Sequence, residues 1–166
     1  MKPNQKLIFT KYFTARVSLP PDKQKRQATF IEALETLQDF KVFFGKYQLN
    51  PRECQRCHFK DFVPNEKMTD VYIAVELLTD AYQDLYDTAL LISADSDLTP
   101  PLNALKRLFP AKRVIVAFPP NRASQELKIV ADGYFTIGRR NIARSLFPLE
   151  VQKANGFVLK CPERWR

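Results

Sequence analysis

Residues 86–98, with the sequence YDTALLISADSDL, decide the fold. The uncharged segment 89–93 predicts a short strand covered on both faces, because apolar residues without polar alternation are typical of parallel sheets between helices. The strand ends abruptly at Asp95, Ser96 and Asp97. Reacting sites of open α/β sheets lie beyond the carboxyl ends of the strands, so we expect the site here. Two neighbouring carboxylates repel each other, and a bound cation would remove that cost.

Charge is distributed unevenly along the 166 residues, whose net charge is +8. Residues 1–60 carry twelve Lys and Arg against five acids, residues 61–98 one against nine, and residues 99–166 thirteen against four. An acidic middle within a basic chain suits a protein that holds a metal cation and binds phosphates around it. The same distribution also fits a basic protein with one acidic helix face.

The remaining elements follow from periodicity and from helix-start signals. In the first half we expect a strand over residues 11–17, a helix over 22–37 that Asp22 caps, a second strand over 41–47 and an irregular connection over 50–66. The second half predicts a helix from residue 68, a helix with Thr99 as N-cap, a strand over 113–118, a helix that Ser124 caps as far as residue 130, and a strand over 134–137. We expect a main domain over residues 1–149 and a weakly structured C-terminal extension over residues 150–166.

The string Cys54, Cys57 and His58 has the form C-x-x-C-H. Covalent haem attachment is disfavoured, because nothing else in the chain indicates export or a haem pocket. A zinc site needs four ligands, and Cys161 is the residue that could complete the set. The alternative is two reduced thiols in a surface loop, since three cysteines do not make a disulfide framework.

No apolar run is long enough to span a bilayer, and no signal-peptide core is present. We therefore expect a cytoplasmic protein without a membrane partner.

Four segments together resemble the NYN domain family, the LabA-like branch of the PIN-like nucleases. They are KYFTAR near the start, EKMTDVYIAVELL, YDTALLISADSDLTPPL and KRVIVAFPPNRAS, in the family's order and spacing. The resemblance implies an α/β fold with three layers, Rossmann-like (PIN-like), around a mainly parallel central sheet. It also implies hydrolysis of RNA phosphodiester bonds with Mg²⁺ or Mn²⁺.

The resemblance assigns roles to particular residues. Asp70 and Asp95 would be metal ligands, and Asp97 would be either a third ligand or the group that orients the attacking water. Ser96, Arg122, Arg139 and Arg140 would contact the nucleic acid, the arginines through its phosphates. Asp70 has a simpler interpretation as well, because an acid in the first turn of a helix is favoured by the helix dipole.

The chain departs from the family at its beginning. The family opens with a central strand that ends in an Asp, and residues 1–10 contain no acid. The strand at 89–93 would then have an open edge. The chain could be a truncated form of a longer protein, which is the explanation we favour. Alternatively, residues 5–12 could shift into the central position, or a second copy could supply a strand in a homo-oligomer.

Two functions from different classes follow. The first is a metal-dependent endoribonuclease, and the second is an RNA-binding protein of the same fold that lacks the first acidic motif and does not cut. A receiver-like phosphotransfer domain is a third and weaker interpretation, because no lysine follows the strand at 113–118.

Overall fold

The computed structural model describes residues 5–165, which form two compact units. Of the described residues, 5–72 and 147–165 belong to the first unit, and Ile73–Leu146 form the second. None of the helices in the described part of the chain is long and apolar enough to cross a membrane.

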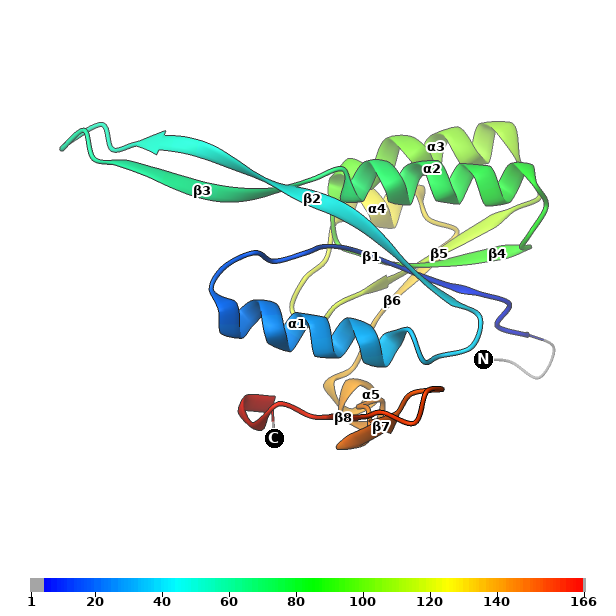
Figure 1. The fold of residues 1–166 in the computed structure, drawn as a ribbon. Helices are drawn as coiled ribbons and strands as arrows, with labels where there is room; N and C mark the ends of the chain where they lie inside the picture. Colours follow the sequence, from blue (N-terminus) through cyan, green and yellow to red (C-terminus); the bar gives the residue numbers. More distant parts are fainter. Residues whose placement is uncertain (1–4, 166) are drawn as a thin grey trace. The chain divides into compact units, whose positions relative to one another are not determined.

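The first unit is built on a three-stranded sheet of order β1-β2-β3 (Figure 1). Strand β1 (Thr10–Ala15) runs parallel to the start of β2 (Phe40–Glu53), and the two are linked by helix α1 (Pro21–Leu34). Strand β3 (Lys60–Lys67) returns antiparallel to the rest of β2. The predicted strand–helix–strand order is therefore confirmed for this part of the chain.

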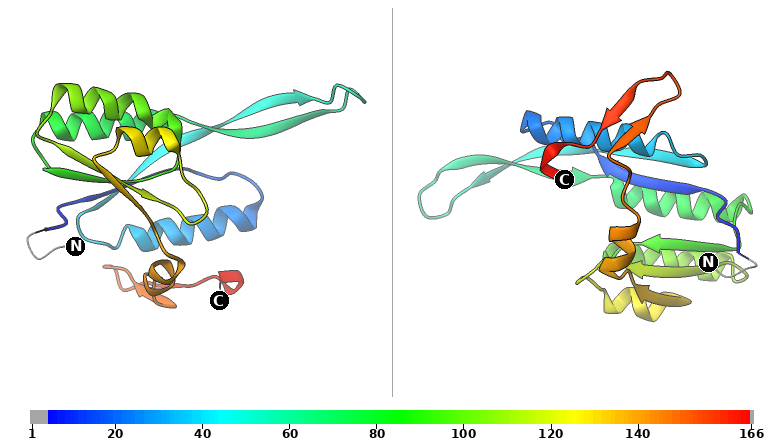
Figure 2. Two further views of the ribbon diagram at one scale, coloured as in Figure 1. Left: turned by 180° about the vertical axis from the view of Figure 1, so that it is seen from behind. Right: turned by 90° about the horizontal axis from the view of Figure 1, so that it is seen from below.

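The prediction of an irregular connection over residues 50–66 is wrong, because β2 and β3 form a long hairpin there (Figures 1 and 2). Pro51 and Pro64 argued against strands, since proline cannot donate to a sheet ladder. Beyond Gly45, however, β2 pairs with β3 alone, so this part of the hairpin is a two-stranded ribbon. Each strand of a ribbon has one unpaired side, where proline is tolerated.

Helix α1 contacts the first sheet where the Phe30 ring meets the Tyr12 ring of β1 edge-on, and Ile31 and Leu34 of the helix are buried. Gln27 ties the helix to the end of β1: its Oε1 accepts a hydrogen bond from the Val17 amide at 2.7 Å, and its Nε2 donates to the Ala15 carbonyl at 2.9 Å. Asp22 does not cap the helix as predicted. Pro20 occupies the N-cap position and Asp22 lies in the first turn.

The C-terminal residues are ordered, contrary to expectation. Strands β7 (Glu150–Gln152) and β8 (Val158–Lys160) form an antiparallel pair, followed by the short 3₁₀ helix η2 (Glu163–Trp165). The Phe30 ring of α1 contacts the Trp165 ring edge-on, with centroids 6.2 Å apart, and Lys153 Nζ lies 2.9 Å from Glu32 Oε2. These long-range contacts, which a local pattern does not reveal, hold the segment in the first unit.

The second unit contains a parallel sheet of order β4-β5-β6, made of Thr88–Ile92, Arg113–Phe118 and Gly133–Thr136. Helices α3 (Thr99–Leu108) and α4 (Gln125–Val130) connect these strands. Helix α2 (Thr69–Tyr82), which begins in the first unit, lies with α3 and α4 on one face of this sheet (Figures 1 and 2). Helix α5 (Arg139–Arg144) follows β6. The strand over 113–118 and the Ser124 cap of α4 are confirmed.

The core of the second unit lies between this sheet and its helices. Its most buried side chains are those of Leu98, Leu102, Leu105, Val114, Val116, Phe118 and Leu127. Strand β4 contributes Ala89 and Leu91 to this core, while Leu90 and Ile92 are 57% and 61% exposed. Within the second unit only one face of β4 is packed, so this unit by itself does not cover the strand on both faces.

The fold class is mixed α/β, with parallel pairing in both units and one antiparallel pair in the first sheet. Within residues 5–165, β4 pairs with β5 in the second unit, and residues 10–12 of β1 pair with β2 in the first. The open edge of β4 and the three explanations for the missing opening strand of the family stay predictions.

Gly45 is a position at which a side chain cannot be accommodated. A Cβ atom there would lie 2.6 Å from the Lys67 carbonyl oxygen and 2.7 Å from Thr69 Oγ1. We expect Gly45→Ala to lower the free energy of unfolding by about 1–3 kcal/mol, measured by urea denaturation, because the backbone of Lys67 must shift. Gly138→Ala is the control, since a Cβ there meets nothing within 4 Å. Equal effects of the two changes would contradict the steric explanation.

Candidate active site

The carboxylates after β4 are held in a short, well-defined turn. Asp95 caps the 3₁₀ helix η1 (Ser96–Leu98): its Oδ1 accepts a hydrogen bond from the Asp97 amide at 3.1 Å. The Asp95 amide in turn donates to Ser93 Oγ at 3.1 Å. Such local side-chain-to-backbone bonds are typical of Asp and Ser in turns. Asp95, Ser96 and Asp97 are all exposed, so the turn presents two carboxyl groups to solvent.

The register of the parallel sheet brings three loops to the same edge. Ile92, the last residue of β4, pairs with Ala117, and Phe118 at the end of β5 pairs with Thr136 of β6. The loops that follow these strands therefore begin at one end of the sheet. They carry the carboxylates after β4, Arg122 after β5, and Arg139 and Arg140 after β6. The predicted phosphate-binding arginines and the Asp95 turn thus share one edge of the second unit, and all three arginines are exposed.

Asp70 lies in the first turn of α2, in the first unit. It has a polar interaction in the structure, as do Glu76 and Asp80. Across residues 5–165, no three His, Cys, Asp or Glu side chains gather closely enough to hold a metal ion. Asp70 belongs to the first unit and the Asp95 turn to the second, so the ligand set of Asp70, Asp95 and Asp97 stays a prediction.

The two carboxylates of the turn nevertheless have the chemistry of a magnesium or manganese site. Mg²⁺ takes oxygen ligands and is commonly bound by one or two carboxylates, with water and substrate phosphates completing the shell. Asp95 and Asp97 supply hard oxygen donors on an exposed turn, where a phosphate can reach the same ion. The residues present therefore fit such an ion.

The start of α3 differs from the prediction. Leu98, not Thr99, occupies the N-cap position, and no side chain caps this helix. Thr99 Oγ1 is buried, and no hydrogen-bond partner is found for it among the described residues. The residue before Thr99 already has a helical conformation, because the 3₁₀ turn that Asp95 caps runs directly into α3.

Asp132 is a structurally important acid that the sequence did not reveal. It joins β5 to the start of β6: its Oδ2 accepts from the Val114 amide at 2.7 Å, and its own amide donates to the Val114 carbonyl at 2.9 Å. Lys106 Nζ lies 3.2 Å from Oδ1. Burial by itself would raise the pKa of Asp132, but the bonds from Val114 and Lys106 outweigh it and lower the pKa.

Lys112 holds the opposite end of this sheet. Its ammonium contacts the Asp84 carboxylate and donates to the Tyr86 carbonyl oxygen. The Tyr86 hydroxyl donates to the Leu77 carbonyl at 3.2 Å, and burial, with a smaller effect from Asp80, raises the pKa of Tyr86 to about 12. This network fixes the connection between α2 and β4, at the amino edge away from the Asp95 turn.

The predicted zinc residues are only partly brought together. Cys54 and Cys57 lie side by side at the tip of the β2–β3 hairpin and are exposed. Hydrogen bonds from the amides of Arg56 and Cys57, and from the Cys57 thiol, lower the pKa of Cys54. His58 Nδ1 lies 2.8 Å from Glu53 Oε1, while the Cys161 thiol contacts the Pro162 carbonyl. The four-residue set is therefore not formed.

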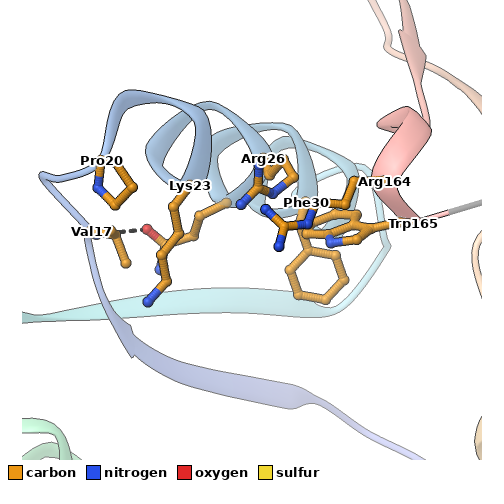
Figure 3. Close-up of a pocket in the computed structure, with 8 residues that line it drawn as sticks. Val17, Pro20, Lys23, Arg26, Phe30, Arg164 and Trp165 are labelled. Atoms are coloured by element: carbon orange, nitrogen blue, oxygen red, sulfur yellow. Dashed lines mark hydrogen bonds between the residues drawn. The ribbon is translucent and has the colours of Figure 1, made fainter.

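A basic groove in the first unit is a further feature that sequence reasoning missed (Figure 3). It has a volume of about 560 Å³, and cationic and aromatic side chains lie around it. Its lining includes Lys23, Arg26, Phe30, Arg164 and Trp165. Because α1 and η2 lie at opposite ends of the chain, no local pattern could have joined these residues.

Comparison with known proteins identifies the family of this chain. The NYN domain family profile matches residues 4–140. One solved structure, that of a protein of unknown function from Vibrio parahaemolyticus, is similar in fold. Its TM-score is 0.56 at 23% identity, and the match covers 80% of this chain and 70% of that one. Among curated proteins, none matches this sequence.

The second unit has a parallel sheet with carboxylates and arginines in the loops at its carboxyl edge. The family match covers most of the sequence, and the chain belongs to the NYN domain family. Proteins of this family are generally assigned as nucleases of the PIN-like kind. NYN domains act on nucleic acids, and nucleases of this kind typically use divalent metal ions.

The contacts of Asp132 make stability depend on pH. Its pKa is lowered in the folded protein, so its stabilising contribution is complete above the unfolded value of about 4 and is lost as the pH falls through the folded value. We expect Asp132→Asn to lower the free energy of unfolding by about 1–2 kcal/mol at pH 7. The difference from the wild type, followed by urea denaturation, should shrink below about pH 4. A difference that does not change with pH would contradict this role.

Proposed function

We propose that this protein is a metal-dependent endoribonuclease that hydrolyses RNA phosphodiester bonds. The observation that carries the proposal is the shared carboxyl edge of β4, β5 and β6, where an exposed pair of carboxylates lies at the same end of the sheet as three arginines. Membership of the NYN family supports the class of reaction. We also propose that the protein is cytoplasmic and that its fold has three layers around one mainly parallel central sheet.

Asp95 and Asp97 would hold a Mg²⁺ or Mn²⁺ ion, with Asp70 as the further acid that the family pattern indicates. The hydrogen bonds of Asp95 to Ser93 and to the Asp97 amide preset the shape of the turn before substrate binds. Asp97 acts as the second ligand or orients the water that attacks phosphorus. When bound, the ion supplies an acidified water and stabilises charge on the phosphate oxygens.

The arginines would bind and position the RNA. Arg122, Arg139 and Arg140 are exposed at the ends of neighbouring strands, so they can contact successive phosphates of one chain. Ser96, between the two acids, can donate its hydroxyl to a phosphate oxygen. Such contacts fix the orientation of the backbone and carry little sequence information.

The second candidate is an RNA-binding protein of the same fold that does not cut. It is favoured by one observation, that residues 1–10, where the family pattern has a strand ending in an Asp, contain no acid. The arginine edge does not depend on that acid, so binding could persist where turnover is absent.

Asp95→Asn separates these two functions. We expect the change to reduce Mn²⁺-dependent cleavage of single-stranded RNA at least about 100-fold, because it removes one charged ligand while leaving an exposed turn intact. Cleavage is measured on a labelled oligonucleotide, and folding by circular dichroism. Asp87→Asn is the matched control: Asp87 is also exposed, but it precedes β4 at the amino edge of the sheet. Full cleavage by the Asp95 variant would remove this acid from the mechanism.

The arginine edge is tested by the salt dependence of RNA binding. We expect the double change Arg139→Gln and Arg140→Gln to flatten the plot of log affinity against log salt by about 0.7 for each phosphate that the variant no longer neutralises. Binding is measured by fluorescence anisotropy in EDTA, so that no cleavage occurs. Arg107→Gln, an exposed change in the last turn of α3, should leave the slope unchanged. Equal slopes for wild type and double variant would place the RNA elsewhere.

A further inference from the structure

The tip of the β2–β3 hairpin has a backbone shape suited to hold a metal. The Cys54 amide donates to the Phe59 carbonyl at 2.9 Å, and the His58 amide donates to the Cys54 carbonyl at 2.8 Å. His58 has a φ of 56°, which turns the chain sharply after the second cysteine. The tip is thus a closed, hydrogen-bonded turn at the end of the ribbon (Figure 1).

The turn brings the two cysteines, three residues apart, close together, because the amide that follows Cys57 donates to the Cys54 carbonyl. The amides of Arg56 and Cys57 and the Cys57 thiol are hydrogen-bonded to Cys54. Backbone N–H groups aimed at sulfur stabilise thiolate ligands in the way that outer hydrogen bonds stabilise metal ligands in general. Two adjacent thiolates are a suitable chelate for a soft divalent ion such as Zn²⁺.

One chain supplies only half of a zinc site. Structural zinc takes four ligands in a tetrahedron, and no third His, Cys, Asp or Glu joins Cys54 and Cys57 in the described part of the chain. His58 Nδ1 is bound to Glu53, and the Cys161 thiol contacts the Pro162 carbonyl. A tetrahedral site therefore needs two further ligands besides Cys54 and Cys57.

A second copy of the same tip fits the requirement. Two-fold symmetry would place two identical pairs of thiolates around one ion, because an isologous contact repeats the same groups on both sides. Phe59 and Phe62 beside the tip are 67% and 63% exposed, so they provide apolar surface that such a contact can bury.

Charge does not oppose this contact. The acids of the tip are already paired within their own hairpin, Asp61 with Arg52 at 3.4 Å and Glu53 with Lys60 at 3.8 Å. Arg56, between the two cysteines, is an exposed cation that can offset the negative charge of a four-thiolate zinc site.

We propose that Cys54 and Cys57 of two copies of this chain bind one zinc ion and join the copies through their hairpin tips. Each thiol loses its proton to solvent as its sulfur binds, and no oxidant or reductant takes part. Cys54 and Cys57 belong to the first unit and the Asp95 turn to the second, and the proposal does not depend on RNA cleavage.

The experiment adds Zn²⁺ to the reduced, metal-free full-length chain and measures metal content and molar mass by light scattering. We expect one zinc ion for every two chains and a doubling of mass, reversed by EDTA. Cys54→Ser and Cys57→Ser should each lose both effects. Cys161→Ser and His58→Ala should keep both, because neither residue is a ligand in this proposal.

Other outcomes would overturn the proposal. One zinc ion per chain at monomeric mass would mean a site completed within the chain, and loss of zinc in the Cys161 or His58 variant would identify the missing ligand. A molar mass that doubles without metal would show that zinc is not needed for the contact between the two copies. Co²⁺ gives an independent readout, since four thiolates produce intense visible absorption that the Cys54 variant should lack. RNA cleavage by that variant should equal the wild type, so failure here leaves the ribonuclease proposal standing.

Discussion

The parallel pairing of β4 with β5 is the interaction on which the candidate site depends. Its register, with Ile92 opposite Ala117, fixes where both strands end and so brings the Asp95 turn and Arg122 to one edge. The pairing is held from one side by the core of the second unit, in which Val114, Val116 and Phe118 are fully buried. A slip of one residue would turn these side chains away from the helices, so the register is strongly specified.

The two edges of this sheet are used differently. At the amino edge, the Lys112 ammonium donates to the Tyr86 carbonyl, and the Tyr86 hydroxyl donates to the Leu77 carbonyl. These bonds hold the connection before β4 and stabilise the fold. At the carboxyl edge, Asp95 and Asp97 are exposed to solvent, and Asp95 is bound to the backbone amide of Asp97. Acidic groups that folding leaves in solvent at a strand end are available for a cation and its phosphates.

The hairpin of the first unit adds a separate chemistry. Its distal part pairs only with itself and ends in two thiols, whose surroundings favour soft metal ions. The carboxylates of the second unit favour hard ions such as Mg²⁺. The thiols and the carboxylates therefore favour different metal ions. Either pair of side chains can be substituted without changing the other.

The sequence by itself determined the local features. The strand over 113–118, the Ser124 cap and the turn of carboxylates after β4 were predictable, because each depends on neighbours within a few residues. Tertiary structure decided the rest. Pairing turned residues 50–66 into a hairpin, packing left Leu90 and Ile92 exposed, and Asp132 gained its role from Val114. These outcomes depend on contacts between distant residues, whose free energy no local pattern contains.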